Sequence, residues 1–96
     1  MNLKLVSDKG NRADELLNNE VFKDALANLR NAIVAKWQEC PVRDVEAQHE
    51  LKLMTKLLTD LEANIRVFIQ DGQMAVFEIN EQRKRDEQRR KVQRFL

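Results

Sequence analysis

The sequence predicts an all-α protein: an antiparallel helical hairpin with a short N-terminal helical turn and a C-terminal charged helix. The first observation is composition, because the 96 residues include only two glycines and one proline, and 34% of them are charged. Such a composition favours long helices. The second is that no segment alternates apolar and polar residues as a half-buried strand would. The third is a run of apolar residues within 44–71 that recur at steps of four and three, which is typical of a packed helix.

Segment 44–71 is the helix against which we expect the other segments to pack. Asp44 is suited to cap its start, and Glu46 places negative charge in its first turn. Gly72 follows the periodic run directly, and a glycine at that position usually marks a helix C-terminus. We therefore expect a break at Gly72 and a separate helix over 73–96. The alternative is that the helix continues through this glycine.

A second amphipathic helix is expected over residues 20–38, with Asn19 as its N-cap. Pro41 should end it, because the residue before a proline avoids the α region. The short connection to residue 44 implies an antiparallel hairpin. The expected core or oligomer seam of the two helices comprises Phe22, Leu26, Leu29, Ile33, Trp37, Leu51, Met54, Leu58, Leu61, Ile65 and Phe68.

Residues 1–18 are expected to form a flexible lead-in that ends in a short helical turn, because turn-forming residues occupy 7–11. Helix 44–71 is longer than helix 20–38, so part of its apolar face must be covered by something else. Residues 1–18, the C-terminal helix or another copy of the chain would each satisfy this requirement. The length difference favours a homo-oligomer.

The C-terminal segment is basic, since residues 80–96 carry a net charge of +4 and residues 1–79 a net charge of −3. Opposite charges four residues apart predict stabilising pairs on an exposed helix. These pairs are Glu81 with Arg85, Asp86 with Arg90 and Glu87 with Lys91. Three interpretations stay open: a solvated helix, a docking tail for a protein, or a nucleic-acid contact through residues 83–94. The candidate partner or phosphate contacts are Arg83, Lys84, Arg85, Arg89, Arg90, Lys91, Arg94, Phe95 and Leu96.

The sequence contains no recognisable catalytic or metal-binding pattern. His49 and Cys40 are the only histidine and cysteine, whereas metal sites usually draw on several such ligands. No phosphate-binding loop or hydrolase motif occurs, so we expect no enzyme activity and no cofactor. No apolar run is long enough to span a membrane, and the N-terminus lacks a signal-peptide core. A single cysteine suits a reducing compartment.

The run 13–75 resembles a group of small helical proteins encoded in tailed-bacteriophage and prophage genomes. The resemblance rests on 16–19 (LLNN) before Phe22, on Ala25 and Leu29, on Trp37 followed by Pro41-x-Arg43-Asp44, and on two later stretches, 51–58 (LKLMTKLL) and 72–75 (GQMA). It implies a small non-enzymatic viral protein that acts in particle assembly or DNA packaging. The resemblance assigns a functional role to no individual residue of this chain.

These observations together predict a single helical domain over 1–96 that acts as a bacteriophage structural or assembly protein. The hairpin would form the oligomer, and the C-terminal helix would dock to another phage structural protein. The alternative is a nucleic-acid-binding accessory of DNA packaging, similar to a terminase small subunit, or a small regulatory protein. The expected location is the virion or the host cytoplasm.

The central seam residue of helix 44–71 offers a test of this assignment. Leu58→Asp places a charge among apolar neighbours, so we expect the protein to unfold or to lose its oligomeric state. Thermal unfolding and light scattering would detect either effect. An unchanged melting curve and mass would contradict the seam.

Overall fold

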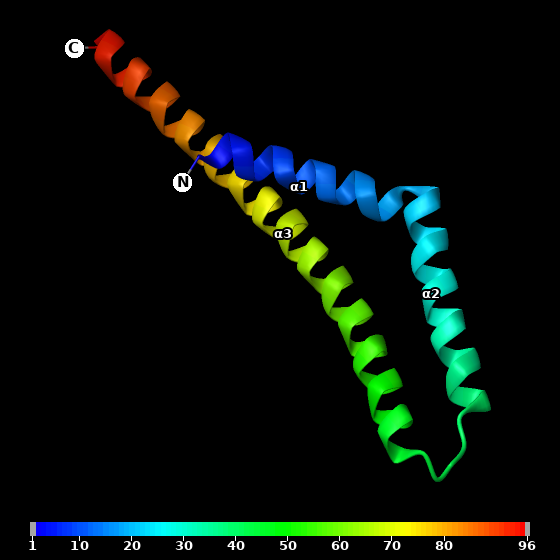
Figure 1. The fold of residues 1–96 in the computed structure, drawn as a ribbon. Helices are drawn as coiled ribbons and strands as arrows, with labels where there is room; N and C mark the ends of the chain where they lie inside the picture. The colour runs from blue at the N-terminus through cyan, green and yellow to red at the C-terminus, as the bar shows by residue number, and fades with distance from the viewer. Residues whose placement is uncertain (1, 96) are drawn as a thin grey trace.

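The computed structural model describes residues 2–95 and consists of three helices (Figure 1). Helix α1 spans Leu3–Asn18, α2 spans Glu20–Glu39 and α3 spans Val45–Phe95. The described residues contain no strand. The predicted all-α class is therefore confirmed.

The molecule is a thin, extended layer of helices. Its principal extents are 81 × 25 × 15 Å and its radius of gyration is 22.3 Å, whereas a compact domain of this length would have a radius of gyration of about 12.5 Å. Figure 1 shows α3 as the long side of a triangle, with α1 and α2 as the two shorter sides. Beyond the N-terminus of α1, the last part of α3 projects without a neighbouring helix.

The junctions between the helices follow from local chemistry. Asn19 has extended backbone angles, and its side-chain oxygen accepts a hydrogen bond from the Phe22 amide at 3.0 Å. Cys40 is also extended, directly before Pro41. The Asp44 carboxylate accepts a hydrogen bond from the Ala47 amide at 3.0 Å and so caps α3. The predicted caps at Asn19 and Asp44, and the stop before Pro41, are confirmed.

The expected lead-in over residues 1–18 is wrong, because α1 is a helix of 16 residues. Its N-cap is Asn2, whose side chain accepts hydrogen bonds from the amides of Lys4 and Leu5. One face of α1 packs on α3, and its residues recur at steps of three and four: Leu3, Val6, Gly10, Ala13 and Leu17. The sequence allows three segments or partners to cover the part of the apolar face of 44–71 that helix 20–38 cannot reach. The structure shows that the segment 1–18 is one of them.

Helices α1 and α3 run antiparallel and touch at a glycine crossing formed by Gly10 and Gly72. A Cβ atom built on Gly10 would lie 2.8 Å from the Gly72 Cα and 2.9 Å from the Phe68 carbonyl oxygen. A Cβ atom on Gly72 would lie 2.9 Å from the Gly10 Cα. All three contacts are with backbone atoms, which cannot rotate away. The two backbones approach closely only because both positions lack a side chain.

The predicted break at Gly72 is wrong, since α3 continues through it without interruption and the separate helix over 73–96 does not exist. Gly72 allows α1 to pack closely on α3 and does not end the helix. It continues the periodic seam, because Phe68, Gly72, Ala75 and Ile79 follow at steps of four, three and four. Ala75 is the most deeply buried apolar residue, at 3% exposed.

The predicted hairpin is not confirmed as the packing unit. Helix α1, not α2, makes the more extensive contact with α3, and α2 diverges from α3 toward the α1–α2 corner (Figure 1). The predicted seam is accordingly buried only in part. Its buried members are Leu26, Leu51 and Ile65, its half-buried members are Phe22, Ile33 and Leu58, and its exposed members are Leu29, Trp37, Met54, Leu61 and Phe68.

The glycine crossing gives a prediction in which packing and helix propensity oppose each other. Alanine favours a helix over glycine by about 1 kcal/mol, but overpacking costs about 1–3 kcal/mol. We expect Gly10→Ala and Gly72→Ala each to lower the free energy of unfolding, measured in urea, and to separate α1 from α3.

Asn11→Ala is the matched control, because Asn11 neighbours Gly10 on α1 and is exposed. This variant gains helix propensity without a clash, so its stability should rise by some tenths of a kcal/mol. A stabilised Gly72→Ala protein would contradict the crossing.

Candidate functional site

The layer has two sides of different chemistry, which two contacts identify. Lys9 Nζ on α1 lies 4.8 Å from the centre of the Phe68 ring on one side. The ion pair between Arg30 of α2 and Glu62 of α3 lies on the other. Helical geometry places Phe68 and Glu62 about 120° apart around α3. The two contacts therefore mark opposite sides of the layer.

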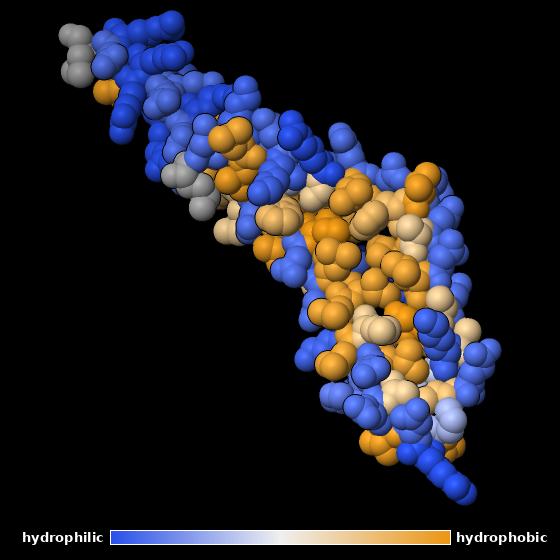
Figure 2. Space-filling model, in the orientation of Figure 1, coloured by the Kyte–Doolittle hydropathy of each residue, from blue (hydrophilic) through white to orange (hydrophobic). Residues whose placement is uncertain are grey.

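The side marked by Phe68 is apolar, and we call it the apolar side. Helical periodicity places on it two exposed leucines from α1, one from α2 and three from α3. These residues, with Phe68, are between 41% and 67% exposed, and Leu57 is the most exposed of them. They are Leu5, Leu16, Leu29, Leu53, Leu57, Leu61 and Phe68. In Figure 2, apolar surface fills the area between the three helices, whereas hydrophilic surface covers the outer edges.

The opposite side is mainly polar. A shallow hollow beside the glycine crossing is lined there by Asn11, Asp14 and Gln73. Thr55 and Thr59 turn their hydroxyls back onto carbonyls of α3 at 3.2 and 3.1 Å. Its groups are mainly ones that water solvates well, although Phe77 is exposed away from the apolar side as well.

The isolated chain exposes far more surface than a compact protein of its mass. Its accessible surface is 8389 Å², whereas a folded monomer of 11.3 kDa would expose about 5,700 Å². Part of the difference belongs to the projecting end of α3. The remainder reflects a layer that is one helix thick, in which no described side chain is completely buried.

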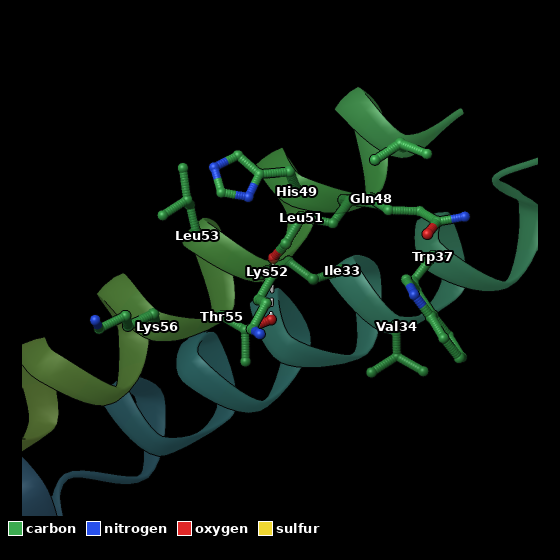
Figure 3. A pocket seen from close by; sticks show the side chains of 11 residues that line it. Ile33, Val34, Trp37, Gln48, His49, Leu51, Lys52, Leu53, Thr55 and Lys56 are labelled. Carbon is green, nitrogen blue, oxygen red and sulfur yellow. Dashed lines mark hydrogen bonds between the residues drawn. The ribbon is translucent and has the colours of Figure 1, made fainter. Parts of the chain in front are cut away.

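An open groove lies where α2 and α3 meet near the connection (Figure 3). Its volume is about 840 Å³. Trp37 and Val34 line it from α2, and His49 and Lys52 line it from α3. Trp37 is 58% exposed, which is high for an indole ring and typical of residues that anchor interfaces.

An ion-pair cluster holds α2 against α3. Glu62 is half-buried, and its two carboxylate oxygens pair with Arg30 from α2 and, at 3.5 Å, with Arg66 on the next turn of α3. Arg30 also donates a hydrogen bond to Glu62. Because this cluster lies on the polar side, it fixes the position of α2 without covering the apolar side.

We call residues 80–95 the basic arm. All seven of its basic residues lie on exposed helix, at positions 83, 84, 85, 89, 90, 91 and 94. The predicted pairs of Arg85, Arg90 and Lys91 with acids four residues earlier are not among the ion pairs that the structure shows for residues 2–95. Glu81 instead pairs with Lys84 at 3.4 Å. Leu96 and the side chain of Phe95 lie outside the described residues.

The groups with potential for chemistry are scattered. His49 lies in the open groove, and the Cys40 thiol donates weakly to the carbonyl oxygens of Pro41 and Asp44 at 3.7 and 3.9 Å. Within residues 2–95, no three histidine, cysteine or carboxylate side chains gather as a metal site would require. No helix in this range is long and apolar enough to cross a membrane.

Sequence reasoning missed the glycine crossing and the buried residues around it. A signal was present, because Gly10 and Ala13 repeat the spacing of Gly72 and Ala75. Each pair of small residues lies within a periodic apolar stripe, which is the pattern of close helix contact.

Comparisons of the chain with protein-family models, curated proteins and solved structures find no match.

The ion-pair cluster predicts a modest, salt-dependent contribution to stability. Glu62→Gln removes the charge that both arginines share. We expect the free energy of unfolding to fall by about 1 kcal/mol, because the side chains of Arg30 and Arg66 are 39% and 60% exposed. Urea unfolding at 0.05 M and at 1 M NaCl should show the loss only at low salt, because salt screens exposed charges. Glu78→Gln, at an exposed position without such partners, should change little; an equal loss would contradict the cluster.

Proposed function

We propose that this chain is a non-enzymatic assembly protein that self-associates through its apolar side and presents the basic arm to a partner. The observation that carries the proposal is the exposure of Leu57 and its neighbours on one side of a layer one helix thick. Stable domains bury such a face against a second layer. No helix within residues 2–95 supplies that layer.

A second copy of the chain is the occupant that the surface fits best. The surface exceeds that of a compact monomer by roughly 2,700 Å², whereas a standard interface needs only about 800 Å² from each partner. A two-fold dimer would bring the same side of both copies together. The polar sides, with Glu62 and its arginines, would then face water.

The setting that the sequence resemblance implies is bacteriophage particle assembly, in the virion or the host cytoplasm. A component of such a particle needs a self-association surface and a second surface for another structural protein. The apolar side and the basic arm are separate and provide both. No arrangement of side chains in the described residues supports an enzyme instead.

A nucleic-acid-binding accessory of DNA packaging, similar to a terminase small subunit, is the second candidate. The observation that favours it is the projection of the basic arm beyond α1 (Figure 1). Here the layer would serve only to pair two arms. The two candidates share the oligomer and differ in the partner of the arm.

Self-association is tested by solution mass, measured by light scattering across concentration. We expect the wild-type chain to form a dimer or a larger assembly of fixed size. Leu57→Glu should shift it to monomer, because an unpaired charge buried in the interface costs about 3–5 kcal/mol, a weakening of at least 100-fold.

Phe77→Glu is the matched control. Phe77 and Leu57 are both 67% exposed on α3, but they lie about 160° apart around the helix. The Phe77→Glu protein should keep the wild-type mass. A wild-type monomer, or equal effects of the two substitutions, would refute the proposed interface.

A further inference from the structure

The basic arm carries a cationic stripe, which we define as Arg83, Arg90 and Arg94. Helical geometry places these three residues within about 40° of one another. They continue the face of α3 that packs on α1, because Gly72 and Val76 lie in the same sector. Helix α1 begins at Leu3, so this face is left uncovered where the stripe begins. Its chemistry changes there from apolar to cationic.

The guanidinium groups of the stripe are available for an external anion. They are exposed, and they take part in none of the ion pairs that the structure shows within residues 2–95. Glu87 lies among them and lowers the local charge, yet the arm retains a net charge of +4. Three aligned arginines span about 16 Å along the helix.

The geometry of the arm favours duplex DNA over other polyanions. The helix with its side chains is about 10–12 Å wide, and the major groove of B-form DNA is about 12 Å wide. The major groove of duplex RNA is too narrow and deep for a helix. Between 80 and 94, where the stripe lies, no aromatic residue occurs, so the stripe itself offers single strands no stacking platform.

Arginine suits this role because its planar guanidinium donates two parallel hydrogen bonds to a phosphate. We propose that the cationic stripe binds the phosphates lining the major groove of duplex DNA, without reading base sequence. The inference rests on the second candidate of the proposed function, because it gives the arm duplex DNA as its partner in place of another structural protein. It depends on self-association only for the presence of two arms.

Counterion release makes the inference quantitative. Three phosphate contacts from each of two arms give a slope of log affinity against log salt of about −5, and a single arm gives about −3. For two arms, the affinity for DNA should fall about 10³-fold between 50 and 200 mM salt. Binding by apolar or hydrogen-bonded contacts alone would show little of this dependence.

The experiment measures binding of the full chain to a fluorescently labelled 20-base-pair DNA duplex by anisotropy. Arg83→Gln with Arg90→Gln removes two charges from the stripe. The matched control, Arg85→Gln with Arg89→Gln, removes two charges from the other face of the same arm. Both variants have the same net charge, so a difference between them reports the stripe alone.

We expect the stripe variant to reduce the slope from about −5 to about −2 and the control to keep it near −5. Equal losses in both variants, or no binding by the wild-type chain at 50 mM salt, would overturn the inference. Tighter binding to a duplex RNA than to the DNA would also overturn the inference. Tighter binding to poly-glutamate would overturn it in favour of an acidic protein partner.

Solution mass measured on the same samples separates this inference from the proposed function. An oligomer that does not bind DNA refutes the inference alone. A monomer that binds DNA with a slope near −3 refutes the self-association and supports the stripe.

Discussion

Backbone contact between Gly10 and Gly72 is the constraint on which the arrangement of the three helices depends. It fixes α1 along the middle of α3 and so determines where α1 begins and where the face of α3 is left uncovered. Each glycine costs about 0.5–1 kcal/mol in a helix relative to alanine. That cost is offset by the apolar contacts that close approach allows among small residues such as Ala13 and Ala75, both buried.

The crossing also explains why the chain is one layer thick. Because α1 takes the seam of α3 at Gly72, helix α2 can pack only on the earlier part of α3, and it does so through Glu62 on the polar side. All three helices lie in one layer, whose smallest extent is 15 Å, and the leucines of the apolar side are uncovered. The apolar side and the basic arm have separate roles, since the first lies across the layer and the second extends beyond it.

Composition and periodicity were sufficient for the helical class, the caps at Asn19 and Asp44 and the stop before Pro41, because these depend on local backbone chemistry. They failed where tertiary packing overrode a local rule. Gly72 has the chemistry of a helix end, but here it is selected by contact with the backbone of α1. Only the matching spacing of Gly10 and Ala13, in a distant segment, signals that contact. The turn-forming residues of 7–11 misled in the same way, since Gly10 serves the crossing. The positions of the basic residues were evident in the sequence, but their lack of cover depends on where α1 begins.

Contact between two copies through the apolar side is the central claim, and nuclear Overhauser effects between a ¹³C-labelled copy and an unlabelled copy test it most directly. We expect intermolecular cross-peaks from the methyl groups of Leu57 and Leu61 to leucine methyls of the second copy, and none from Thr59. Intermolecular cross-peaks from Thr59 alone, or a mixed sample without any, would contradict it.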